Sequence, residues 1–215
     1  MPRRYGESEK EYATQNEAPS IVLRAGEGGV LRAMLAFVER TKAVWQGEGF
    51  ALALESLSAS GAIGVGWPMR LVLLVGACEA LLLPDRRSGL QHAFVNRLAC
   101  MIARDHAQVE EWAAWLRPAY DLRSDVVHGR PLDSIDDLTV LPEQYARDVG
   151  RVVIHALCRL VSHRMEHPAA DSNADPLWRL LDRAPATASA FDELQTRLRS
   201  EHDVPAHQFT LVPRC

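Results

Sequence analysis

The chain has 215 residues, of which 47% are hydrophobic, and this is long enough to bury a substantial core within one domain. Its formal net charge is -4 at pH 7, and its positive charge comes almost entirely from arginine. This balance argues against a surface that coats nucleic acid through many phosphate contacts, so any contact with RNA must be local.

The cysteines and the apolar segments predict a reduced, soluble, cytoplasmic protein. Three of the cysteines lie inside apolar segments, where a thiol packs as a small hydrophobic group: Cys78, Cys100 and Cys158. The longest nearly uncharged apolar run, Leu71–Leu83, has 13 residues, well short of the roughly 20 that cross a bilayer. The N-terminal residues MPRRYGESEKEYATQNE contain no apolar stretch typical of secretory signals, so we expect no membrane partner.

Changes in polarity divide the chain into three predicted parts. Residues 1–25 are polar and lack a sustained hydrophobic period, which predicts a flexible N-terminal arm. Residues 26–168 contain the long apolar segments and predict one helical domain. Residues 169–215 predict a C-terminal helical appendage that is followed by a tail.

The first half of the predicted domain contains a long apolar helix. An amphipathic helix is expected over Val30–Trp45, and Gly47 and Gly49 are expected to stop it. Phe50–Leu57 is expected to form one or two short helical turns before a connector of small residues. Proline is tolerated at the first position of a helix, and the segment Pro68–Leu83 is apolar on nearly all sides. This segment is therefore the predicted central helix, and Pro84 follows it.

Five further segments show the three- and four-residue apolar spacing of helices: Ser88–Arg104, His106–Leu116, Pro142–His167, Pro176–Arg183 and Ala188–Ser200. Pro118 is expected to kink the chain or to restart it, so that Ala119–Val127 forms the helix of the main motif. The apolar stripe of the segment that begins at Pro142 suits a core face or a dimer face. With no long run of period two, the sequence predicts an all-α bundle.

Glu79 is the only acid of the predicted central helix. A carboxylate at such a position must be paired, neutralised, or directed toward a polar cleft. Arg97 lies on the next predicted helix and is the expected partner of Glu79. The two residues could form a structural buried ion pair, or they could act directly at an active site.

The most informative stretch is Tyr120–Gly129, with the sequence YDLRSDVVHG. Arg123 and His128 stand five positions apart, which places their side chains about 140° apart on a straight helix. One helix cannot readily direct both at a single atom, unless the last turn loosens before a left-handed Gly129 or a second copy of the chain takes part. Asp125 is within reach of the imidazole and could orient it, or it could belong to a solvated acidic edge.

Three blocks of the sequence resemble the HEPN domain, specifically its Apea-like branch. They are the apolar segment LVLLVGACEALLL at 71–83, the segment FVNRLACMI at 94–102, and the Tyr-Asp-x-Arg-Ser-x-x-x-His-Gly signature at 120–129. This resemblance implies an all-helical and usually dimeric fold. Many members of the family are metal-independent RNases of toxin-antitoxin, anti-phage and CRISPR-linked systems, whereas others bind nucleotides or serve as structural partners.

The resemblance implies an endoribonuclease with RNA as substrate, a homodimer, and an antitoxin or defence-system partner. The expected catalytic residues are Arg123 and His128, because a permanent guanidinium and an imidazole that titrates near neutrality can cleave a phosphodiester without a metal. The expected supporting residues are Glu79, Arg97, Tyr120, Ser124 and Asp125. The alternative is a non-catalytic HEPN module that binds a nucleotide or a protein partner.

No cofactor and no metal are expected. The segment His163–His167 matches the His-x-x-Glu-His pattern of some zinc peptidases, but it stands at the end of a helix before Pro168. Only 48 residues remain after it to supply a third ligand. The pattern is therefore set aside.

Overall fold

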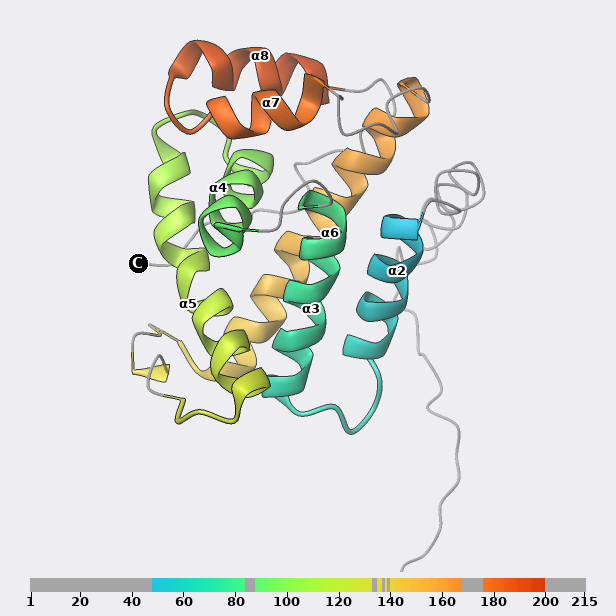
Figure 1. The fold of residues 1–215 in the computed structure, drawn as a ribbon, viewed down its shortest axis with the longest axis vertical. Helices are drawn as coiled ribbons and strands as arrows, with labels where there is room; N and C mark the ends of the chain where they lie inside the picture. Colours follow the sequence, from blue (N-terminus) through green and yellow to red (C-terminus); the bar gives the residue numbers. More distant parts are fainter. Residues whose placement is uncertain are drawn as a thin grey trace, which may run out of the picture. The chain divides into compact units, whose positions relative to one another are not determined.

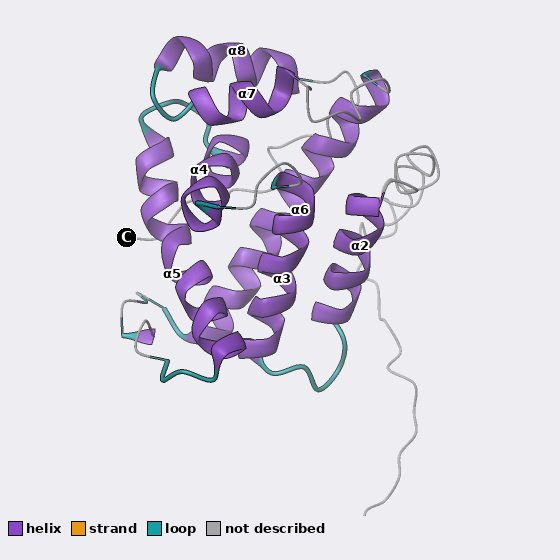
Figure 2. Cartoon of the chain, viewed as in Figure 1, coloured by secondary structure: helices purple, strands orange, loops and turns teal. Residues whose placement is uncertain are grey.

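The computed structural model describes residues 48–83, 88–132, 135–136, 138, 140–167 and 176–199. In these ranges the chain forms seven helices, α2 to α8, and no strand (Figures 1 and 2), which confirms the predicted all-α class. The predicted N-terminal arm, the predicted helix at Val30–Trp45, the linker before Pro176 and the C-terminal tail lie outside the described residues.

Helix α3, Trp67–Leu82, is the central helix, as predicted. It packs against α2, α4, α5 and α6, and Figure 1 shows α2 on one side of it and α5 on the other, with α6 passing behind. A proline stands in its first turn, where the missing N–H would have no partner within the helix. Its buried side chains face several neighbouring helices, which explains why the segment is apolar on nearly all sides.

Helix α2, Glu48–Ser60, is longer than the one or two turns predicted from its sequence. Gly49 was expected to end the preceding helix and the residues after Leu57 to form a connector, whereas Gly49 lies in the first turn of α2 and the helix continues to Ser60. A Cβ at Gly49 would lie 2.8 Å from the carbonyl oxygen of Ala80, so this glycine lets α2 approach the backbone of α3 closely. Arg70 Nε donates to the Ser60 carbonyl at 3.0 Å and ties the end of α2 to the start of α3.

Helices α4, Leu90–Ile102, and α5, Gln108–His128, pack against each other and against α3. The chain does not restart at Pro118, because α5 is one continuous helix that contains this proline. A proline removes the hydrogen bond to the carbonyl four residues before it. Here that carbonyl belongs to Ala114, an exposed residue, so water can replace the lost donor.

Helix α5 ends in a left-handed turn at Gly129, which has φ 61°. The amide of Gly129 donates to the Val126 carbonyl at 3.3 Å, and the amide of Arg130 donates to the Asp125 carbonyl at 2.8 Å. These two bonds form a Schellman motif, which satisfies carbonyls at the end of a helix. The predicted left-handed cap is confirmed, and it fixes where His128 leaves the helix.

Helix α6, Pro142–Glu166, is confirmed as a long amphipathic helix. It packs against α3, α4 and α5, so its apolar stripe is a core face within this chain. The Tyr145 hydroxyl donates to the Trp115 carbonyl of α5 at 2.7 Å. A Cβ added at Gly150 would lie 3.6 Å from Cδ1 of Leu74 on α3, so the two helices are close at this point. Together these contacts set the position of α5 relative to α3.

The C-terminal helices α7, Pro176–Arg183, and α8, Ala188–Leu198, form a pair, and they cover α4 and α6. The side chain of Thr187 caps α8 by accepting from the amide of Ala190 at 3.3 Å. Gln195 Nε2 donates to the Cys100 carbonyl at 2.9 Å, and Arg159 of α6 joins Gln195 to the Met101 carbonyl. Polar side chains therefore satisfy the carbonyls at the end of α4.

Candidate functional site

The candidate site is built around an ion pair between α3 and α5. Arg123 Nη2 lies 2.8 Å from Glu79 Oε2, and the two side chains are 26% and 20% exposed. Glu79 is therefore the partner of Arg123, and the predicted pair between Glu79 and Arg97 is wrong. Arg97 was expected to be the partner because it lies on the helix that follows α3 in the sequence. In the structure the arginine that reaches Glu79 comes from α5 and is Arg123.

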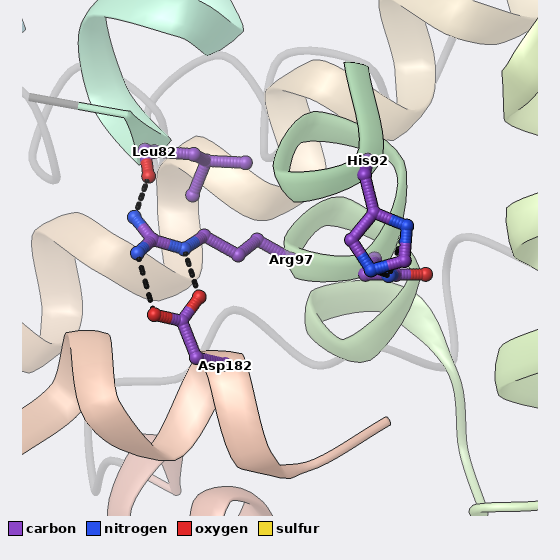
Figure 3. A network of polar contacts seen from close by, with 5 residues as sticks. Leu82, His92, Arg97 and Asp182 are labelled. Atoms are coloured by element: carbon purple, nitrogen blue, oxygen red, sulfur yellow. Dashed lines mark hydrogen bonds and ion pairs between the residues drawn. The ribbon is translucent and has the colours of Figure 1, made fainter. Parts of the chain in front are cut away.

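Arg97 pairs instead with a carboxylate of the C-terminal helices (Figure 3). Its Nε lies 2.9 Å from Asp182 Oδ1 and its Nη2 lies 3.1 Å from Asp182 Oδ2, which is a bidentate geometry. Its Nη1 donates to the Leu82 carbonyl at the end of α3. The guanidinium also stands 5.3 Å from the ring centroid of Trp178. Arg97 is completely buried, so its role in this structure is to join α3, α4 and α7.

Tyr120 lies beside the Glu79–Arg123 pair. Its ring centroid is 5.8 Å from Arg123 Cζ and 5.5 Å from the ring centroid of Phe94 on α4. Burial, the charge of Glu79 and a hydrogen-bonding interaction with the Glu79 carboxylate raise the pKa of Tyr120, while the charge of Arg123 lowers it. The phenol is therefore a proton donor that stays protonated at neutral pH.

The guanidinium of Arg123 has one hydrogen bond in the described part of the chain. Nη2 donates to Glu79, whereas Nε is buried and has no partner among the described residues. Nη1 makes no hydrogen bond there either, and it is not one of the buried atoms. The outer donor of Arg123 can therefore meet a ligand.

His128 is exposed in the last turn of α5. Within the described residues it makes no hydrogen bond, ion pair or ring contact with Arg123. Likewise, Asp125 makes no side-chain hydrogen bond to the imidazole, and Ser124 makes none to either predicted catalytic residue. One chain therefore places Arg123 and His128 on the same helix without joining them, as their five-residue spacing predicted.

Two residues near the site were missed in the sequence. Gln91 Nε2 of α4 donates to Asp121 Oδ1 of α5 at 2.6 Å and fixes the packing of α4 beside Tyr120. Asp182 holds Arg97 from 85 residues away along the chain. No spacing rule connects such distant positions, because only the tertiary packing brings them together.

No described side chains form a group of three or more His, Cys, Asp or Glu residues that could hold a metal ion. His163, part of the metal-like pattern in the sequence, is buried, and its ring centroid lies 4.7 Å from that of His167. Burial raises the pKa of the Cys100 thiol to about 12, and burial followed by the charge of Glu79 raises the pKa of Cys78. Both thiols are therefore held in the unreactive protonated form. None of the described helices meets the length and hydropathy needed to span a bilayer.

Comparisons of the chain with protein-family models, with curated proteins and with solved structures gave no match. The described part of the chain is all-helical. Its helix α5 carries Arg123, which is paired with Glu79, and the exposed His128. Its likeness to the HEPN family rests on the three sequence blocks alone.

Proposed function

We propose that the protein is a metal-independent endoribonuclease of the HEPN type that acts in a defence or toxin-antitoxin role. The observation that carries the proposal is the position of Arg123, held by Glu79 with an outer donor left over, on the helix that ends at the exposed His128. The same helix carries the signature by which the sequence resembles the family. An antitoxin or another defence component is the expected partner, in the cytoplasm.

RNA supplies its own nucleophile in this reaction. The 2′-oxygen attacks phosphorus, the bond from phosphorus to the 5′-oxygen breaks, and a 2′,3′-cyclic phosphate forms. The enzyme must remove the 2′-hydroxyl proton, stabilise the negative charge that grows on the phosphate, and protonate the leaving 5′-oxygen. No metal is needed for any of these steps.

Arg123 and His128 supply the two kinds of group that these steps need. Arg123 donates to the phosphate oxygens, because a guanidinium offers a planar set of N–H donors that matches phosphate oxygens. His128 transfers the proton as general base or general acid, since an imidazole nitrogen can accept a proton and return it. Tyr120, Ser124 and Asp125 stand on the same helix and complete the polar surroundings.

A homodimer completes this site. Arg123 and His128 make no contact within one chain, so two α5 helices related by a two-fold axis would bring Arg123 of one copy near His128 of the other. Each dimer would then hold two composite sites.

A second candidate function is a non-catalytic HEPN module that binds a nucleotide or a protein partner. Two observations favour it: Glu79 already neutralises Arg123, and His128 has no group of the described chain to orient it. Such a module would bind phosphate or a partner surface and would leave RNA intact.

Incubation of the purified protein with mixed RNA, with and without EDTA, separates the two functions. Cleavage should survive EDTA, DNA of the same sequence should stay intact, and the products should end in a 2′,3′-cyclic phosphate or its opened form. Arg123→Ala and His128→Ala should each lower the rate by about a hundredfold or more. The matched controls are Arg151→Ala and His92→Ala, which remove an exposed arginine and an exposed histidine elsewhere. Cleavage that needs a divalent metal, or that persists in His128→Ala, would leave the binding module as the better description.

A further inference from the structure

The proposed function requires that Arg123 present its donors to a phosphate in one orientation. An unrestrained arginine samples many rotamers, and fixing such a side chain costs conformational entropy. In this structure two contacts from different directions already restrain it. Glu79 Oε2 accepts from Nη2 at 2.8 Å, and the Tyr120 ring lies 5.8 Å from Cζ.

We propose that Glu79 is a positioning residue for Arg123, which holds Nη2 of the guanidinium and leaves Nη1 to bind the phosphate of RNA. The proposal rests on the proposed function, because it takes an RNA phosphate as the ligand of Arg123. It replaces the expected role of Glu79 as the partner of Arg97. Glu79 contacts no substrate in this arrangement and acts only through Arg123.

The distribution of donors supports this assignment. Guanidinium donors lie in one plane, so a bond at Nη2 fixes the direction of every other N–H of the group. Nε is buried, Nη2 is bound to Glu79, and Nη1 is neither buried nor bonded within the described residues. The direction left for a ligand is therefore set by the carboxylate on α3.

The charges of the pair oppose tight ground-state binding. The negative charge of Glu79 compensates that of Arg123 and repels a phosphate placed on the far side of the guanidinium. At about 6 Å and an effective dielectric constant of roughly 60, between the values for a protein surface and for bulk water, one such repulsion weakens binding about fivefold. Glu79 should thus improve the orientation of Arg123 while it lowers the affinity for RNA.

These opposite effects can be separated with two substitutions. Glu79→Gln keeps an oxygen that accepts from Nη2 and removes the negative charge, so it should bind a non-cleavable 2′-O-methyl RNA about fivefold more tightly. Glu79→Ala removes the acceptor as well, so kcat should fall about a hundredfold through misorientation of Arg123. Glu79→Gln should recover at least a tenth of the wild-type kcat.

A spectroscopic measurement tests the orientation without any activity. In protein labelled with ¹⁵N at arginine, the buried Nε–H of Arg123 should give a signal that is protected from exchange with water. The signal should persist in Glu79→Gln and broaden in Glu79→Ala. Asp182→Ala is the matched control, because it removes a carboxylate partner of the buried Arg97 and should leave the Arg123 signal unchanged.

The outcomes distinguish this proposal from the proposed function. If the wild type cleaves no RNA but shows the expected binding and exchange pattern, the ribonuclease assignment fails and the positioning role of Glu79 stands. If the wild type cleaves RNA and Glu79→Ala has the wild-type kcat, the positioning role is refuted. If Glu79→Ala does not fold, the affinity of Glu79→Gln for the 2′-O-methyl RNA provides the test. An affinity no higher than that of the wild type also refutes the proposal.

Discussion

Arg97 and Arg123 are both paired with carboxylates of other helices, but their surroundings assign them different tasks. Arg97 is fully buried and binds Asp182, the Leu82 carbonyl and the face of Trp178. Arg123 is 26% exposed and binds through one nitrogen only among the described residues. The first arginine stabilises the fold, and the second is suited to a ligand.

Asp182→Ala should lower the free energy of unfolding by about 3 kcal/mol, because it removes a bidentate carboxylate partner of the buried guanidinium of Arg97. Urea unfolding followed by circular dichroism measures this loss. The control is Asp192→Ala, which removes an exposed aspartate of α8 and should change the stability by less than about 0.5 kcal/mol. Equal stabilities of the two variants would contradict the anchoring role of Asp182.

His155 makes stability depend on pH. Burial and then the charge of Arg159 lower the pKa of His155 from 6.5 to about 4. The folded protein disfavours the charged imidazole, so this contribution is complete above about pH 6.5 and is lost as the pH falls toward 4.

Between pH 7 and pH 4.5 the free energy of unfolding should therefore fall by about 1–3 kcal/mol on account of His155. Chemical unfolding of the wild type and of His155→Gln at both pH values measures the effect, and the substitution should reduce the difference. Parallel pH profiles of the two proteins would show that His155 does not titrate in this range.

At the level of residues, the sequence indicated that Glu79 and Arg97 would form ion pairs, but it did not predict their actual partners. Glu79 was correctly expected to need a partner, because it is the only acid of an apolar helix. Its actual partner could not be inferred, since both arginines lie on helices that pack against α3. Which of the two arginines faces Glu79 depends on the rotation of α4 and α5 about their axes, and the tertiary packing determines this rotation.

At the level of elements, apolar periodicity located α3, α4, α6, α7 and α8 to within a few residues. It failed at α2, whose first turn contains Gly49, and the restart expected as one alternative at Pro118 does not occur, because this proline stands inside α5. In both places the surroundings reduce the penalty: Gly49 is used for a close approach to α3, and the carbonyl released by Pro118 belongs to Ala114, an exposed residue. Intrinsic propensity is overridden by such contacts.

The two glycines Gly129 and Gly76 should respond in opposite ways to alanine. Added Cβ atoms would meet nothing within 4 Å at either position, but Gly129 has φ +61° and Gly76 is an ordinary helical residue of α3. Gly129→Ala should destabilise the protein by about 1 kcal/mol through strain, whereas Gly76→Ala should stabilise it by about 0.5–1 kcal/mol. Thermal unfolding of both variants provides the measurement, and a Gly129→Ala variant that unfolds at or above the wild-type temperature would show that the left-handed turn is not strained by a side chain.

At the level of the whole molecule, the composite site predicts a dimer with a mass twice 23.9 kDa in light scattering at micromolar concentration. It also predicts complementation. A mixture of Arg123→Ala and His128→Ala chains forms heterodimers in which one of the two sites keeps an intact arginine and an intact histidine. RNA cleavage should therefore reappear on mixing and unfolding–refolding, while a fully active monomer would rule out the composite site.

The contact between Arg97 and Asp182 also bears on the order in which the chain folds during its synthesis. The ribosome makes α3 and α4 first, and it adds Asp182 only 85 residues after Arg97. At 5–20 residues per second this interval lasts roughly 4–17 s, during which the nascent chain has no Asp182 to offer the guanidinium. Asp182 supplies a bidentate pair to this buried guanidinium, so the packing of α4 around Arg97 should reach its full stability only after α7 has left the ribosome.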